Sequence, residues 1–552
     1  MTALARRVYR AFAWPVEFGT GAVVATVYLL TLSGNHSETE DSLNYAIRIR
    51  DDPHSQFFEG VHVVFDWVAW VVYEVVRAVG ITRDPLRTIQ VFDALLAAAA
   101  VALLAGILLR AGVSRAATLV ACGIIAFSYG FWKNSVEVEV YTLSAFALVL
   151  SLGAALRAVE RPSSRSFAVL GLANGLAVLA HATNVLFAAV AIAALVLARP
   201  DGPGRAVVRW FGAYAGVACA VVIPVYGVAA GVRRLGSPRE FWDWLTAETG
   251  GGSYGQVDLG ALKEAVVGCS RALVGAHSAL ALHSIRTFVH DHFPSRPLRE
   301  EVFFLRGFST TLAVVLLVLA GLIAALLVAL AASWLSRRTR MTGRARTVAV
   351  LGAVWLVAYV LLFSFWDPLN IELWYVFWMP AAVLLALPLT GERPSRARLA
   401  IGAAAVAGLF VVNLLGSQLP QRANSKDYWH VRARWYRTHL RSDDFLIAYD
   451  YVWSTYLTYL TRGRVVDVQA FFKKMPRSAA ARKARRIADS SHARRVLISD
   501  YVFDPYPGDP QACNDGMGTC ENAAALRRLL LPRSHVVART PLERVWEYRR
   551  PG

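Results

Sequence analysis

Long apolar segments, separated by short polar stretches, make up most of the first 416 residues of the sequence. A helix needs about 20 apolar residues to cross the hydrocarbon core of a bilayer. The apolar segments predict about eleven membrane-spanning helices, at residues 12–33, 88–110, 113–131, 140–157, 166–181, 184–199, 207–230, 308–334, 347–365, 373–389 and 399–416. The apolar run 166–199 is too long for one span, so we divide it at its polar interruption, between His181 and Asn184.

Arginines gather at one end of these predicted helices. With the N-terminus inside, every inner loop contains arginines, whereas the short outer turns contain a single basic residue, Lys133. This asymmetry follows the positive-inside rule and predicts a multi-pass protein of the plasma membrane. Residues 61–80 are also apolar enough to span, but a span there would move every later arginine cluster outside. We therefore interpret them as a helix at the outer interface.

Three regions are then predicted to lie outside the cytoplasm: 34–87, 231–307 and 417–552. The last is the most charged, and it alternates short strand patterns with helical ones. The strand patterns lie at 445–449, 464–468 and 496–499. This alternation is typical of a small α/β domain with a parallel sheet. We thus expect two domains, a transmembrane domain over 1–416 and an extracytoplasmic α/β domain over 417–552.

Composition supports a membrane protein, because 56% of the 552 residues are hydrophobic and the mean hydropathy is +0.42. The net charge of +19 then reflects cytoplasmic loops and contact with membrane lipids. No basic stretch is interleaved with stacking aromatics, so no nucleic-acid partner is expected. Cys513 and Cys520 have a spacing that suits a small disulfide loop outside the cytoplasm, and Cys269 is expected in a loop.

An acidic cluster directly after the first apolar segment is the first candidate for chemistry. Glu38, Glu40 and Asp41 lie where that predicted helix leaves the membrane. Carboxylates near a bilayer are costly unless they are hydrated or used. The alternative is a solvated helix cap, because Ser37–Glu40 resembles a capping box, with Glu38 as the capping residue.

A second acidic pair, Glu137 and Glu139, lies in the short outer turn after the third predicted span. Alternating spacing in an extended turn would point both carboxylates the same way, toward the face that carries Asp41. Other polar residues are predicted to reach this outer face: His62, His181, Asn184, Asp367, Asn370 and Glu372. Their joint placement favours a polar site at one membrane face.

Several motifs in residues 10–416 resemble a known superfamily. The motifs are Phe131-Trp132 leading to Glu139-Val140-Tyr141, Asn174 through Asn184, Gly236 through Trp242 with Tyr254 downstream, and Trp366 through Trp374. Together with the acidic first loop, they resemble the GT-C superfamily of integral-membrane glycosyltransferases, and most closely its protein O-mannosyltransferase-like branch. One motif departs from that branch: Glu59-Gly60-Val61-His62 stands where those proteins tend to have a His-Pro-rich sequence.

The resemblance implies a sugar donor linked to a polyprenyl phosphate. A carboxylate would take the proton of the acceptor hydroxyl as it attacks the anomeric carbon with inversion. We expect Asp41 to be this base, with Glu40 as its rival. The side chains expected to bind the donor or its phosphate are Lys133, His181, Asn184, Arg233, Arg234, Arg239 and Tyr254. A divalent metal held by Asp41, Glu137 or Glu139 is an open alternative.

The acceptor could be a protein, a glycan or a lipid, and the sequence does not distinguish them. A multi-span transporter of a lipid or sugar is the main alternative function. No repeated half is visible in the sequence, and the spans carry few charges, which both disfavour a transporter. A non-catalytic membrane scaffold is the second alternative.

Overall fold

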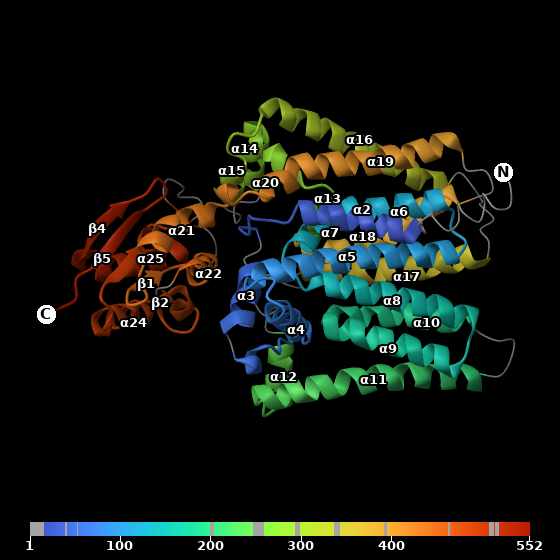
Figure 1. Ribbon diagram of the computed structural model, residues 1–552, viewed down its shortest axis with the longest axis horizontal. Coiled ribbons are helices and arrows are strands. Elements are labelled where there is room, and N and C mark those ends of the chain that lie inside the picture. The colour runs from blue at the N-terminus through green and yellow to red at the C-terminus, as the bar shows by residue number, and fades with distance from the viewer. Residues whose placement is uncertain are drawn as a thin grey trace. The chain divides into compact units, whose positions relative to one another are not determined.

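The computed structural model forms two compact units (Figure 1). It describes residues 16–551 except 39–40, 52, 199–203, 247–258, 293–298, 336–342, 391–394, 462–463, 507–512 and 514–517. Unit 1 comprises Met1–Leu32, Arg48–Ala276 and Val315–Gln418, and unit 2 comprises Ser33–Ile47, His277–Val314 and Leu419–Gly552. Two segments that the sequence assigned to the transmembrane domain therefore belong with the C-terminal part of the chain.

Unit 1 is a helical bundle (Figure 1). Its apolar helices are α2 (Val16–Leu30), α5 (Pro85–Arg110), α6 (Arg115–Phe127), α7 (Tyr129–Val136), α8 (Tyr141–Glu160), α9 (Ser164–Ala180), α10 (Ala188–Leu197), α11 (Arg205–Arg233), α16 (Thr310–Leu335, which begins in unit 2), α17 (Gly343–Trp366), α18 (Ile371–Ala386) and α19 (Arg396–Asn413). Among the described residues, seven helices are long and apolar enough to cross a membrane, or eight if the bent pair α6–α7 is one span. Three shorter apolar helices, Val16–Leu30, Ser164–Ala180 and Ala182–Leu197, lie at other predicted spans.

The predicted span 113–131 is in fact two helices, because α6 and α7 meet at an angle of 61°. The break is at Ser128, whose extended backbone ends α6 and whose hydroxyl donates to the carbonyl of Ile125 at 2.7 Å. Trp132 on α7 is buried and donates its indole N–H to Thr31 at 2.9 Å. The bend between α6 and α7 and the Trp132–Thr31 hydrogen bond hold α7 inside the bundle, where Lys133 is buried.

The long apolar run 166–199 is divided where the sequence predicted. α9 ends at Ala180, and a 3₁₀ segment, η2 (Ala182–Phe187), separates it from α10. The segment around 61–80 forms α4 (Phe65–Ala78), whose 14 residues extend about 21 Å. α4 is not among the helices of the described residues that are long and apolar enough to cross a membrane, and its place at the interface stays a prediction.

The region 231–307 is largely helical. It contains α12 (Pro238–Leu245), α13 (Leu259–Leu273), η4 (Ala276–Ala281), α14 (His283–His292) and α15 (Arg299–Phe304). Cys269, which we expected in a loop, lies in α13. On α12, Phe241 and Trp244 pack against Tyr226, with ring centroids 6.2 and 6.0 Å away. This packing anchors α12 to α11.

Unit 2 contains a five-stranded sheet in the order β2-β1-β3-β5-β4. The strands expected from the sequence are β1 (Phe445–Ala448), β2 (Arg464–Asp467) and β3 (Val496–Ser499), and they pair in parallel. Two further strands, β4 (Ser534–Arg539) and β5 (Arg544–Tyr548), add antiparallel pairs. The sheet is therefore mixed and not parallel as predicted, because β5 pairs antiparallel with both β3 and β4.

Unit 2 also contains the helices α20 (Leu419–Gln421), α21 (Tyr428–His439), α22 (Tyr451–Leu460), α23 (Gln469–Phe472), α24 (Arg477–Ser490) and α25 (Thr519–Leu530). A buried ion pair joins α21 to the sheet domain, with Arg432 donating to Glu543 at 2.6 Å. Ser499 at the end of β3 also donates to Glu543, at 2.8 Å, and accepts the indole N–H of Trp453 at 3.0 Å. These bonds satisfy charges that would be costly if buried alone.

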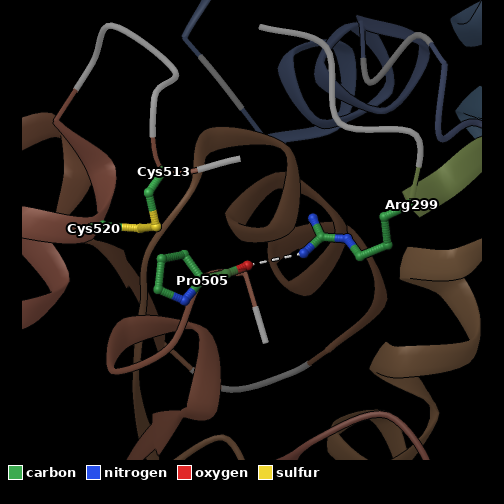
Figure 2. The surroundings of a disulfide bond; sticks show 4 residues. All are labelled: Arg299, Pro505, Cys513 and Cys520. Carbon is green, nitrogen blue, oxygen red and sulfur yellow. Dashed lines mark hydrogen bonds between the residues drawn. A yellow bond between two sulfur atoms is a disulfide. The ribbon is translucent and has the colours of Figure 1, made fainter. Parts of the chain in front are cut away.

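Arg299 ties the segment His277–Val314 to the C-terminal part of unit 2 (Figure 2). Its guanidinium donates to the carbonyl of Pro505 at 3.0 Å and to the hydroxyl of Tyr501 at 3.1 Å. It also lies 4.9 Å from the ring centroid of Trp429, within cation–π range. Nearby, Cys513 and Cys520 form the disulfide that their spacing suggested, with Cα atoms 5.4 Å apart.

Candidate functional site

Asp41 is the first residue of α3 (Asp41–Asp51) and is half-buried. The N-terminus of a helix carries partial positive charge, which stabilises a carboxylate in its ionised form. An ionised carboxylate is the form that a general base requires. Glu40, the rival base, lies outside the described residues.

The segment Ser33–Ile47 that carries Asp41 is bonded to residues of the C-terminal part of unit 2. The backbone N–H of His36 donates to Asp427 at 2.9 Å, and the side chain of Asn35 donates to the carbonyl of Lys426 at 3.2 Å. On α3 itself, Asn44 donates to the hydroxyl of Tyr451 at 2.8 Å. These bonds fix the backbone on both sides of Asp41.

Asp427 is the main anchor of this segment. It is fully buried and accepts hydrogen bonds from the hydroxyl of Tyr456 at 2.6 Å and the N–H of His430 at 2.9 Å, as well as from His36. Burial raises the pKa of Asp427, although its hydrogen bonds act in the opposite direction. Three donors around one buried carboxylate make the attachment specific.

Glu38, which the sequence suggested as a helix cap, has partners from distant segments of the chain. Its carboxylate forms an ion pair with His277 and accepts a hydrogen bond from Gln421 at 3.3 Å. The hydroxyl of the neighbouring Ser37 donates to Asn35 at 2.6 Å. Glu38 thus joins all three segments of unit 2. Of the described acidic residues in the first motif, Asp41 is the one at the start of α3.

In unit 1, the second acidic motif follows α7. Glu137 and Glu139 are both buried, with 1% of their surface exposed. The backbone N–H of Glu139 donates to Asp93 on α5 at 3.1 Å, and the hydroxyl of Thr142 donates to the same carboxylate at 2.6 Å. Asp93, itself fully buried, therefore holds the turn that presents Glu139.

Three of the predicted outer-face residues are brought together near Tyr141. The hydroxyl of Tyr141 donates to Glu372 at 3.2 Å, and its ring lies 5.5 Å from the imidazole of His181. The backbone N–H of the residue after His181 donates to the carbonyl of Val61 at 2.6 Å, which places His62 in the same region. Unit 1 thus gathers His62, His181 and Glu372 at one end of its bundle.

A chain of ion pairs surrounds His62. Its imidazole lies 3.0 Å from Glu59, Glu59 pairs with Arg48, and Arg48 donates to the buried Asp66 at 2.7 Å. Burial alone would raise the pKa of Glu59, but the hydrogen bonds and positive charges of His62 and Arg48 prevail and lower it to about 2. Burial raises the pKa of Asp66, against the effect of Arg48.

The side chains expected at the donor phosphate have different surroundings. Lys133 is buried on α7, whereas the side chain of Arg239 on α12 is 91% exposed. Arg233 donates to the carbonyl of Phe58 at 2.9 Å. Tyr254 lies outside the described residues. Of these side chains, Lys133 is therefore the cation that the bundle encloses.

Asn184 takes part in the packing of the bundle. Its amide group donates to Ser144 and to the carbonyl of Ala177, both at 2.8 Å, and its side-chain oxygen accepts from Tyr359 at 3.0 Å. These bonds give Asn184 a structural role that the sequence did not indicate, and its expected role at the donor stays a prediction. Asn370 caps α18, accepting the N–H of the second residue after it at 2.9 Å.

Sequence reasoning missed Asp93, Arg48 and Asp427. Asp93 is an acidic residue within an apolar span, a signal that by itself indicates a functional or packing role. Arg48 and Asp427 carry no such signal, because their partners are distant in the sequence. Among the described residues, no three His, Cys, Asp or Glu side chains are grouped as metal ligands would be.

Part of the chain matches a protein-family profile, and the fold resembles solved structures. Residues 68–202 match the profile of the protein O-mannosyl-transferase TMEM260 N-terminal domain. The crystal structure of ArnT from Cupriavidus metallidurans bound to undecaprenyl phosphate is similar to nearly the whole chain, with a TM-score of 0.52 and 14% sequence identity. The chain resembles the GT-C glycosyltransferases.

The structural match covers 95% of this chain and 96% of ArnT, and the apo state of ArnT gives the same values. At this identity, the likeness to ArnT shows a shared fold. None of the curated proteins matches the sequence. The resemblance predicted from the motifs, to the O-mannosyltransferase-like branch of the GT-C superfamily, is confirmed.

Proposed function

We propose that this protein transfers a sugar from a polyprenyl-phosphate-linked donor to an acceptor hydroxyl at the outer face of the membrane. The observation that carries the proposal is the fold shared with ArnT over nearly the whole chain, together with the O-mannosyl-transferase match. The undecaprenyl phosphate bound to ArnT supports a polyprenyl donor here. The eleven spans, with the N-terminus inside and the C-terminal domain outside, belong to this proposal.

An apolar groove on unit 1 suits the tail of such a donor. It has a volume of about 570 Å³ and lies between α16, α17 and α18. Its lining is apolar, and includes Phe377 and Trp378 on α18. The same helix carries Glu372 and Tyr375, and the hydroxyl of Tyr375 donates to the carbonyl of Tyr141 at 2.8 Å. One helix thus contributes to both an apolar groove and the polar end of the bundle.

In the proposed reaction, Asp41 removes the proton from the acceptor hydroxyl. The acceptor oxygen forms a bond to the anomeric carbon while the bond from that carbon to the phosphate oxygen breaks. Polyprenyl phosphate leaves, and the configuration at the anomeric carbon is inverted. Lys133 and His181 are the candidates to stabilise the charge on the leaving phosphate. The proposal assigns no step to a metal.

The test is Asp41→Asn in the full-length protein, with Glu40→Gln in parallel. Membranes containing each variant are supplied with synthetic polyprenyl-phosphate mannose, and release of polyprenyl phosphate is measured. Loss of a general base lowers the rate by about 10²–10⁴-fold, which we expect for Asp41→Asn only. Retained release in Asp41→Asn with loss in Glu40→Gln would move the base to Glu40. Equal release by both variants and the wild type would overturn the assignment.

A further inference from the structure

A second groove on unit 1 lies at the arginine-rich end of the bundle. It has a volume of about 580 Å³ and is formed by α5, α8 and α9. The proposed reaction uses no residue of this groove. Its lining has an apolar part and a charged part, so the groove is complementary to an amphiphilic ligand.

The apolar part comes from one face of each helix. On α9, Val169, Leu172 and Leu176 follow helical spacing and are 44%, 44% and 47% exposed. Leu150 on α8 is 39% exposed. Exposed aliphatic side chains on membrane-spanning helices face the acyl chains of lipids. This part of the groove therefore suits hydrocarbon.

The charged part contains three arginines, Arg110, Arg157 and Arg161, and one carboxylate, Glu160. Glu160 is paired with Arg344 on α17 at 3.1 Å. Within the described part of the chain, no acidic side chain pairs with any of the three arginines. The groove thus ends in a cluster of guanidinium groups whose positive charge is not neutralised by the described residues.

The local structure holds this cluster in place. Gly153 on α8 allows close packing on α5, because a Cβ there would lie 3.0 Å from the side chain of Ile107. The turn between α8 and α9 is closed by a capping box, in which Ser163 and Ser166 bond reciprocally. Arg157, in the last turn of α8, and Arg161, its C-cap, therefore lie next to a well-defined connection.

We propose that this groove binds an anionic phospholipid, with the phosphate at the arginines and an acyl chain along Leu150, Leu172 and Leu176. Guanidinium groups bind phosphate oxygens in a bidentate manner, and basic pockets between membrane helices suit anionic head groups. The exposed leucines select a lipid over a free phosphate ion. This site is independent of the proposed glycosyl transfer.

The experiment measures lipid binding to the full-length protein in detergent by native mass spectrometry. The probes are dioleoyl phosphatidylglycerol, dioleoyl phosphatidylcholine, dihexanoyl phosphatidylglycerol and inorganic phosphate. We expect dioleoyl phosphatidylglycerol to bind most tightly. The variant Arg157→Gln/Arg161→Gln should weaken its binding by about tenfold or more. The matched control is Arg115→Gln/Arg165→Gln, which removes two exposed arginines outside the groove.

Three results would overturn the proposal. They are equal binding of phosphatidylcholine and phosphatidylglycerol, an equal loss of binding in both double variants, and binding of inorganic phosphate as tight as that of the long-chain lipid. The size-exclusion profile and the thermal unfolding midpoint of each variant show whether it is folded, so that a loss of binding is attributed to the groove only in a folded protein.

Discussion

At the scale of single residues, several buried charged side chains are linked to one another by consecutive ion pairs. Glu59, between His62 and Arg48, is held ionised by two positive partners. Its pKa of about 2 lies below the ordinary value of 4.5. A carboxylate whose pKa is lowered by folding adds stability above its unfolded pKa, and this contribution is lost as the pH falls toward the folded pKa.

We therefore predict that the protein loses stability between about pH 4.5 and pH 2 in part through Glu59. The variant Glu59→Gln should lower the thermal midpoint at pH 6 and show a weaker fall below pH 4.5, measured by intrinsic fluorescence in detergent. The contribution at neutral pH is on the order of 1–3 kcal/mol.

The control is Glu74→Gln, which removes a partner of Arg77 in a more exposed pair on α4. Exposed pairs contribute little, so its pH profile should follow the wild type. A pH profile of Glu59→Gln identical to that of the wild type would refute the role of this ion pair.

At the scale of elements, close helix packing depends on small residues. α9 and α11 run side by side (Figure 1), and Gly171 and Gly175 on α9 form a small-xxx-small pattern toward α11. A Cβ at Gly171 would lie 2.2 Å from the backbone oxygen of Tyr214. A backbone atom cannot move aside as a flexible side chain can, so the helices would have to separate.

We predict that Gly171→Ala destabilises the bundle by about 1–3 kcal/mol, because overpacking forces the backbone to shift. The thermal midpoint and the monodisperse fraction on size-exclusion chromatography should both fall. Gly216→Ala on α11 is the matched control, since a Cβ there meets nothing within 4 Å. Equal midpoints for the two variants would contradict the close approach at Gly171.

At the scale of the whole molecule, the C-terminal part of the chain forms one compact unit with two earlier segments. Unit 2 includes the segment Ser33–Ile47, and Asp427 bonds the backbone N–H of His36 across a separation of 391 residues. The candidate base Asp41 thus lies in a segment whose backbone is held by the C-terminal domain. This gives that domain a structural role in the proposed site.

We predict that Asp427→Ala loosens residues 33–47 and lowers sugar transfer, because it removes the carboxylate that accepts hydrogen bonds from His36 and Tyr456. Hydrogen exchange of peptides from 33–47 should increase, while the helices of unit 1 keep their protection. Asp443→Ala is the control, since Asp443 is exposed and its pair with Arg494 is 3.6 Å long. Unchanged exchange at 33–47 in Asp427→Ala would contradict the anchoring role.

The apolar helices, the three parallel strands and the acidic motifs could be predicted from the sequence, because these features depend on local composition and spacing. A span is recognised from its own residues, since the bilayer surrounds it whatever the tertiary fold. The division of the apolar run 166–199 near His181 could be predicted for the same reason, because the polar residues that interrupt the run are part of its own sequence.

Which polar groups meet could not be predicted, because it depends on how distant segments pack. Asp93 with Glu139, Arg48 with Asp66, and Asp427 with His36 are pairs joined by packing and not by spacing along the chain. The pairing of Glu38 with His277, the antiparallel strands β4 and β5, and the bend between α6 and α7 were decided in the same way. Periodicity shows that a polar residue is present, but its partner is chosen by contacts between distant segments.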